Sequence, residues 1–175
     1  MAEERTPERS SQPPQSAWLL DAERDVQARL DGQPFDFRSL DAIANIYRAA
    51  SAIRRKAEGE VLAPYGLSFG AFTILWVLWI WDDMETARLA RECNLAKGTL
   101  TGMLNTLEKR ELIERNRVES DMRRMMVSLT EPGTTLIAEV FPKFNEFEGE
   151  MSAGLTNAEK DELADLLRRV IQNAL

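Results

Sequence analysis

The stretch ETARLARECNLAKGTLTGMLNTLEKR, residues 85–110, contains two helical patterns separated by a short break. The first pattern, at 85–92, has a small apolar face, and residues 93–95 predict the turn that follows it. The second pattern, at 96–110, carries large apolar residues at the spacing of one helical face: Leu100, Met103, Leu104 and Leu107. Two short helices joined by a tight turn are typical of a helix-turn-helix.

The outward face of the second helix carries small polar residues, glycines and one cation. These candidate DNA contacts are Lys97, Gly98, Thr99, Thr101, Gly102 and Asn105. Threonine and asparagine can hydrogen-bond to base edges, and lysine can reach guanine or a phosphate. An ordinary solvated helical face has the same appearance, so the segments on either side of this helix decide between the two interpretations.

The sequence LIERNRVESDMRRMMVSLT, residues 112–130, predicts a strand, a polar tip and a second strand. LIER and MMVSLT have strand character, whereas NRVESDMR between them is polar and turn-prone. A two-stranded β wing beside a helix-turn-helix makes a winged helix, and its tip can place arginine in the minor groove. The candidate DNA contacts of this wing are Arg115, Arg117, Asp121, Arg123 and Arg124. The alternative to DNA contact is a surface salt bridge between Asp121 and Arg123, worth about 0–1 kcal/mol. This salt bridge is compatible with Arg123 also entering the minor groove.

The charge distribution is compatible with a nucleic-acid interface although the whole chain is acidic. The 175 residues carry a formal net charge of −7, whereas residues 84–130 hold 9 bases and 7 acids, a net charge of +2. Residues 1–83 and 131–175 are both acidic. A nucleic-acid binder needs a local basic face and not a basic total, so the mild positive charge of the central block permits that role.

The single cysteine, Cys93, and the absence of histidine narrow the possible chemistry. An internal disulfide is impossible, and the usual zinc sites need clustered cysteine and histidine ligands. The commonest general base and the usual nucleophilic triads are also missing, so we expect neither an enzyme nor a cofactor. Cys93 lies in the predicted turn, where a small buried apolar filler is favoured over a redox switch.

The N-terminal part of the chain predicts a tail and two helices. Residues 1–15 are polar, contain three prolines and are expected to be disordered. The extension at 16–38 predicts a helix that Ser16 could cap and Gly32 could end. A longer helix is expected at 39–63, before Pro64 and Gly66 break it.

The apolar run at 69–81 predicts a buried helix with Ser68 as its cap, because 13 residues are too few to cross a membrane. Its tryptophans, Trp76, Trp79 and Trp81, are interpreted as core packing rather than as a ligand cage. The N-terminus has no basic-then-apolar layout of a signal peptide. We therefore expect a cytoplasmic protein that does not engage a membrane.

The C-terminal residues 131–175 predict two helices with more apolar surface than a winged helix at 64–130 could cover. The first has a broad apolar band and is expected to bend at Pro142. The second opens with a capping box, Thr156 to Glu159, and continues with a leucine-rich stripe. We expect these helices, with the long helix before the winged helix, to be dimerisation helices that pair with a second copy. The expected fold class is mainly α.

Residues 39–172 resemble the MarR family of bacterial transcription regulators, in GLSFGAFTIL, ARLARECNLAKGTLTGMLNTLEKRELIER, DMRRMMVSLTEPG and GLTNAEKDELADLLRRV. The most specific mark is a D-x-R followed by V-x-L-T, at Asp121, Arg123, Val127, Leu129 and Thr130. The resemblance implies a homodimer that binds palindromic double-stranded DNA, with a recognition helix starting near Ala96 and Arg123 in the minor groove. It also implies a repressor that a small aromatic or phenolic effector, or oxidation, releases from DNA.

The chain departs from the family pattern in three places. Gly102 and Thr106 stand where the family often has arginine, so binding would depend more on the wing and on Lys97. Glu111 stands where a glycine is usual after the recognition helix. Residues 1–38 extend beyond the core of the family.

A ligand pocket, if the chain has one, is expected between the dimerisation helices and the winged helix. By placement it would draw on Tyr47, Arg54, Trp76 and Trp79. The leading interpretation is thus a homodimeric DNA-binding repressor that responds to a ligand. A winged helix used only for protein contacts is the first alternative, and an enzyme that uses carboxylates ranks last because no paired-acid site is visible.

Overall fold

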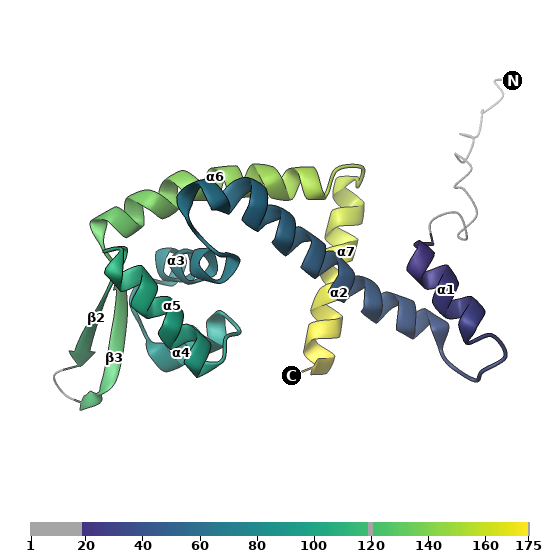
Figure 1. Cartoon of the computed structure of the whole chain (residues 1–175), viewed down its shortest axis with the longest axis horizontal. Coiled ribbons are helices and arrows are strands. Elements are labelled where there is room, and N and C mark those ends of the chain that lie inside the picture. Colours follow the sequence, from purple (N-terminus) through teal and green to yellow (C-terminus); the bar gives the residue numbers. More distant parts are fainter. Residues whose placement is uncertain (1–18, 119–120, 175) are drawn as a thin grey trace, which may run out of the picture. The chain divides into compact units, whose positions relative to one another are not determined.

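The computed structural model describes the backbone of residues 19–118 and 121–174, in two compact units that divide between Ala49 and Ala50. Helices make up most of the described chain, together with one small antiparallel sheet (Figure 1). The predicted fold class, a mainly α winged helix-turn-helix, is confirmed.

The first unit contains α1, Asp21–Arg29, and the beginning of α2, Phe37–Ala57. Glu23 on α1 joins the two helices, because its buried carboxylate accepts hydrogen bonds from the backbone N–H of Leu20 and the side-chain amide of Asn45. Both bonds are 2.7 Å long. They lower the pKa of Glu23, the Leu20 bond most of all, so the buried group is charged and satisfied.

Two helix boundaries of this unit differ from the sequence-based prediction. α2 begins at Phe37 and not at Ser39, because the carboxylate of Asp36 accepts from the backbone N–H and the hydroxyl of Ser39 and caps the helix earlier. α1 ends before Gly32, which adopts a φ of 76° in the following turn. Ser16, the predicted cap, and the tail before it lie outside the described residues.

The C-terminal end of α2 continues into a turn of π-helix (η2), Glu58–Leu62, and a 3₁₀ turn (η3), Ala63–Tyr65. Pro64 does not break this path, because it stands in the first turn of η3, where a missing N–H costs nothing. The chain turns at Gly66, whose φ of 61° is the left-handed conformation that glycine adopts without a Cβ penalty.

The central helix of the second unit is α3, Phe69–Trp81, which contacts α6, β3, α4 and α5. Ser68 caps it as predicted, since its hydroxyl accepts from the backbone N–H of Ala71 at 3.2 Å. The helix is covered on most of its circumference, and its buried large side chains are Phe72, Ile74, Leu75, Val77 and Leu78. The expectation of a helix wrapped by other elements is therefore confirmed.

The tryptophans of α3 do not all belong to the core. Trp76 and Trp79 are half-buried against it, whereas Trp81 is 45% exposed. The prediction of core packing is wrong for Trp81, because α3 ends there and leaves the ring at the edge of the unit. Trp81 still packs edge-on against Trp76, with 5.4 Å between the ring centroids.

The helix-turn-helix consists of α4, Thr86–Glu92, and α5, Lys97–Lys109. The sheet beside it contains β1, Met84–Glu85, β2, Ile113–Val118, and β3, Asp121–Leu129, in the order β1-β3-β2. Both neighbouring pairs are antiparallel. β2 and β3 form the predicted wing, which projects at one end of the unit (Figure 1).

The sheet corrects two details of the prediction. Glu85 was expected in the first helix, but it pairs with Met126 and, with Met84, adds a third strand. The polar segment 116–123 was expected to be a loose tip, but the paired strands extend as far as Val118 and Asp121. Backbone pairing along the hairpin outweighs the weak strand propensity of these polar residues.

Two long helices complete the second unit: α6, Glu131–Met151, which packs on α3, and α7, Asn157–Ala174. α6 runs through Pro142 as one helix. α7 begins with the predicted capping box, since the hydroxyl of Thr156 accepts from the Glu159 N–H and the Glu159 carboxylate accepts from the Thr156 N–H. No residue of α7 is buried. The division into dimerisation helices and a winged helix stays a prediction.

The end of α5 and the start of α6 meet in a hydrogen-bonded joint. Glu111 has a φ of 59°, and the N–H of Leu112 bonds back to the carbonyl of Leu107 at 3.0 Å, as in a Schellman motif. The Thr130 hydroxyl donates to the Glu111 carbonyl at 2.6 Å and accepts from the Gly133 N–H at 3.1 Å. Glu111 therefore adopts the conformation that the family's usual glycine would favour.

Within the described part of the chain, no one helix has both the length and the apolar composition to cross a membrane. Only the bent pair of helical segments at Phe37–Tyr65 and Phe69–Trp81 meets those two criteria together.

Candidate nucleic-acid interface

α5 is held on the unit by its apolar face and presents its polar face to solvent. Leu100, Leu104 and Leu107 are buried, as the helical spacing predicted. Met103 is half-buried against Gly70, where a Cβ would lie 2.7 Å from the Met103 terminal methyl carbon, so a larger residue at position 70 would make the flexible end of Met103 move. All six candidate contacts of the outer face are exposed: Lys97, Gly98, Thr99, Thr101, Gly102 and Asn105. Their contact with DNA stays a prediction.

The glycines of this outer face are not required by the packing of the chain. A Cβ placed on Gly98 or Gly102 would meet nothing within 4 Å, and neither residue has a positive φ. Glycine inside a helix costs about 1 kcal/mol relative to alanine. Packing within the described residues therefore does not account for glycine at these two positions.

The threonines beside these glycines have their hydroxyl hydrogens occupied. The Thr101 hydroxyl donates to the Lys97 carbonyl at 2.9 Å, and the Thr106 hydroxyl donates to the Gly102 carbonyl at 3.1 Å. Each oxygen then remains available as an acceptor. In the major groove such an acceptor suits the amino groups of adenine and cytosine.

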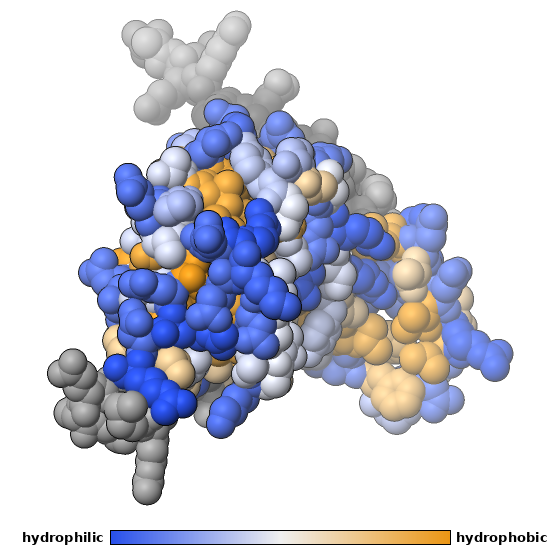
Figure 2. All heavy atoms as spheres, turned by 60° about the vertical axis from the view of Figure 1, so that its left-hand side comes forward, coloured by the Kyte–Doolittle hydropathy of each residue, from blue (hydrophilic) through white to orange (hydrophobic). Residues whose placement is uncertain are grey.

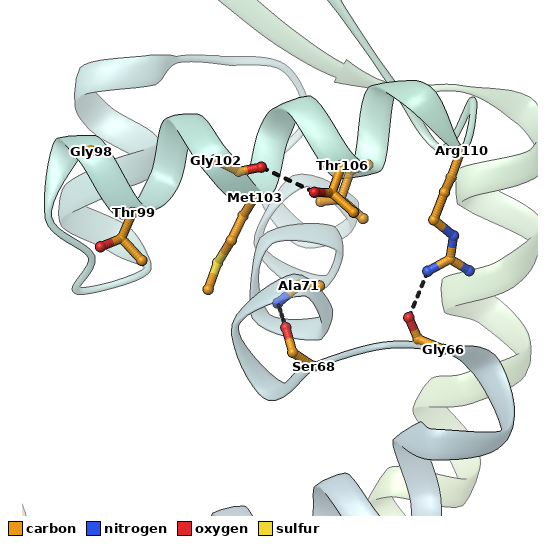
Figure 3. A pocket seen from close by; sticks show the side chains of 10 residues that line it. Gly66, Ser68, Ala71, Gly98, Thr99, Gly102, Met103, Thr106 and Arg110 are labelled. Carbon is orange, nitrogen blue, oxygen red and sulfur yellow. Dashed lines mark hydrogen bonds between the residues drawn. The ribbon is translucent and has the colours of Figure 1, made fainter.

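A hollow of about 420 Å³ lies on one side of α5, between that helix and the beginning of α3 (Figure 3). Gly98, Thr99 and Thr106 line it from α5, and Ser68 lines it from the cap of α3. At its end, the guanidinium of Arg110 donates to the carbonyls of Gly66 and Tyr65 at 2.8 and 2.9 Å. These bonds fix the end of α5 to the turn that precedes α3.

A second hollow of about 430 Å³ lies on the other side, between α4, α5 and β3. Lys97 and Thr101 line it from α5, and Arg124 lines it from β3. The Arg124 guanidinium forms a salt bridge with Glu85 of β1 and lowers the pKa of that carboxyl by donating a hydrogen bond to it. Arg124 is thus held beside the outer face of α5 by the third strand, which the sequence did not reveal.

The other four predicted wing residues divide into three groups. Arg115 turns toward α5, where its guanidinium donates to the side-chain oxygen of Asn105 at 2.9 Å and pairs with Glu108. Arg117 is exposed on β2. Asp121 and Arg123 lie on β3, but their side chains are outside those that the structure describes, so their contact with each other stays a prediction.

The four candidate ligand-binding residues are distributed over both units. Tyr47 belongs to the first unit and is 71% exposed. In the second unit, the Arg54 guanidinium lies over the Phe69 ring, and Trp79 packs on Phe141. Only Trp76 of the four lines a cleft of about 230 Å³ between α3 and α6. Binding at these residues stays a prediction.

The buried face of the turn carries Cys93, at the end of α4. Its side chain is 9% exposed, and burial raises the pKa of the thiol to about 11. The interpretation of Cys93 as a packing residue is confirmed, because a reactive cysteine needs an accessible thiolate.

The surface on the side of the wing is predominantly hydrophilic (Figure 2), with hydrophobic residues in small patches between the polar ones. An exposed polar helix, flanked by lysine and arginine and followed by a β hairpin, defines a winged-helix DNA-binding protein.

Comparison with known proteins supports the assignment to the winged-helix DNA-binding proteins. The profile of the MarR family matches residues 67–125. The HTH-type transcriptional regulator YwaE of Bacillus subtilis is 37% identical over 158 residues, which cover 89% of this chain and 92% of YwaE.

Two solved structures share the fold. A mutant of MarR from E. coli, complexed with operator DNA, superposes with a TM-score of 0.68 at 22% identity, over 76% of this chain and 95% of that one. BpsR of Bordetella bronchiseptica, whose structure addresses regulation of DNA binding by 6-hydroxynicotinic acid, has a TM-score of 0.69 at 21% identity, over 74% and 98%.

The chain belongs to the MarR family. It is a DNA-binding transcriptional regulator and not an enzyme, as the sequence predicted.

Proposed function

We propose that the chain is a homodimeric repressor that binds an inverted-repeat operator, with α5 in the major groove and the β2–β3 wing in the minor groove. The observation that carries this proposal is the outer face of α5. Gly98 and Gly102 leave two positions of this face without side chains, although a Cβ at either position would meet no neighbouring atom. Small side chains allow the helix backbone to approach the groove floor and let Lys97, Thr101 and Asn105 reach base edges or phosphates. In this arrangement Arg117 and Arg123 are the cations that the wing brings to the minor groove.

The homodimer is supported by apolar side chains that α7 leaves exposed. Four of them lie on one side of the helix and are between 36% and 57% exposed: Leu163, Leu166, Val170 and Ile171. A contiguous apolar stripe on a protein surface marks an interaction site. A second copy of the chain covers it by twofold symmetry, which sets two recognition helices roughly 34–36 Å apart, one DNA turn.

Release by a small aromatic or phenolic effector is the third part of the proposal. The cleft between α3 and α6 is lined by Phe72, Phe141, Phe144 and Trp76, and Thr73 and Glu148 add polar atoms at its wall. The indole N–H of Trp76 is buried without a hydrogen-bond partner among the described residues. An aromatic ligand whose acceptor oxygen reaches that buried donor would satisfy it. The relative BpsR, described as regulated by 6-hydroxynicotinic acid, is a precedent for such a ligand.

A regulator of this kind works where the bacterial chromosome lies, so we place the protein in the cytoplasm.

Selection from random duplexes with the full-length protein tests the proposal. An inverted repeat with half-sites about one turn apart is the expected result, and a sequence-independent pool would contradict operator recognition.

Arg123→Ala is expected to weaken binding to every selected duplex and to reduce the dependence of affinity on salt, because one cation contact is lost. Unchanged affinity in that variant would remove Arg123 from the interface.

A further inference from the structure

The structure joins two residues that the sequence proposed as separate DNA contacts. Arg115 comes from β2, and Asn105 lies one turn before Glu108 on α5. One guanidinium nitrogen of Arg115 donates to the Asn105 side-chain oxygen at 2.9 Å and also to the carboxylate of Glu108. Asn105 is an exposed residue, so its side chain is open to solvent.

The chemistry of the guanidinium decides which way the amide points. Arginine carries only donors, so the Asn105 atom that faces Arg115 has to be the carbonyl oxygen Oδ1. The amide nitrogen Nδ2 and its two N–H groups then face solvent. Asparagine normally offers one donor side and one acceptor side, but here the acceptor oxygen faces Arg115 and one of its two lone pairs is already used within the protein.

Arg115 is itself held firmly. Its side chain is 23% exposed, and the Glu108 carboxylate anchors it from the same face of α5 that carries Asn105. The hydrogen bond from Arg115 lowers the pKa of Glu108, so this anchor is charged. A charge-assisted bond of this kind is stronger than one between neutral groups, and it keeps the guanidinium in place beside Asn105.

The fixed amide has a consequence for base recognition. Asparagine reads adenine with both of its sides, because adenine offers an acceptor at N7 and a donor at N6. Guanine offers only acceptors, N7 and O6. We propose that Arg115 is a positioning residue that makes Asn105 read guanine rather than adenine. This inference rests on the proposed placement of α5 in the major groove.

Binding selection with four full-length variants tests the assignment. Asn105→Ala is expected to reduce a preference for guanine at one position per half-site by roughly tenfold. Asn105→Asp leaves an acceptor facing outward, so guanine should lose its advantage to cytosine, whose amino group donates. Arg115→Met frees the amide, and adenine should become as good as guanine at that position. Arg117→Met, a neighbouring exposed arginine on β2, is the matched control and should weaken all duplexes equally.

The outcomes separate this inference from the proposed function. If the wild type selects no inverted repeat, operator recognition fails. If it selects one but Asn105→Ala changes no position, or the position it changes prefers adenine, the reading of guanine is wrong. If guanine is preferred as strongly in Arg115→Met as in the wild type, Arg115 does not position the amide. Because Asn105 is exposed, its two variants remain informative even if Arg115→Met unfolds.

Discussion

Glu111 is held in a backbone conformation that suits a glycine. It has a φ of 59° at the end of α5, where a side chain with a Cβ costs about 1–2 kcal/mol. Glycine removes this strain but loses more entropy on folding, so Glu111→Gly is expected to raise the free energy of unfolding by about 0.5–1 kcal/mol. Urea titration at one fixed protein concentration measures it. Glu111→Ala keeps the Cβ, and an equal gain in that variant would show that strain is not the cause.

Cys93 is predicted to be chemically inert in the folded protein. Burial disfavours the thiolate and raises the pKa of the thiol to about 11, so only about a thousandth of it is ionised at pH 8. Alkylation by iodoacetamide at pH 8 should be at least about fiftyfold slower in the native protein than in urea. DNA binding should also be unaffected by peroxide, with Cys93→Ser as the control. Rapid native alkylation would overturn this assignment.

At the scale of single residues, the sequence predicts whether a side chain is exposed better than it predicts which way that side chain points. The apolar spacing of α5 was enough to place Asn105 and its neighbours on the outside, because helical period fixes a face. It could not show that Arg115 turns back to Asn105, since a strand residue can face either side of a hairpin and the partner is ten residues away. Short polar segments carry no period that resolves this choice.

Among the elements, the start of α6 depends on one glycine. A Cβ at Gly133 would lie 1.9 Å from the carbonyl oxygen of Leu112, which is backbone and cannot swing away. Gly133→Ala is therefore expected to lower the free energy of unfolding by about 2–3 kcal/mol. Gly149→Ala is the matched control on the same helix, because nothing lies within 4 Å there, and it should stabilise the helix by about 0.5–1 kcal/mol. Chemical denaturation of both variants measures the difference, and equal effects would contradict a steric role for Gly133.

The elements that the sequence missed are those with the fewest residues. β1 has only two, Met84 and Glu85, which is too short for an alternating pattern, and its pairing with β3 brings together residues some forty positions apart. The long apolar elements were predicted correctly because each buries many residues at a regular spacing. α3 is an instructive case: its composition required burial, but only the structure shows that the covering stops at Trp81.

In the molecule as a whole, the apolar face of α7 is exposed in a way that one chain does not explain. Leu166 is 47% exposed in the middle of this face. Leu166→Glu places a charge on each side of the proposed twofold interface, so we expect dimers to dissociate at micromolar concentration and operator affinity to fall by at least about tenfold, because a monomer engages one half-site. Light scattering after size exclusion measures the mass.

Gln172 provides the control for that test, because each residue advances about 100° around a helix and Gln172 lies on the other side of α7. Gln172→Glu adds the same charge but should leave the mass and the operator affinity unchanged. A wild-type protein that runs as a monomer, or a Leu166→Glu variant that stays dimeric, would contradict the interface. If Leu166→Glu is monomeric and folded but still binds a full operator as tightly as the wild type, the two half-sites are not read by paired recognition helices.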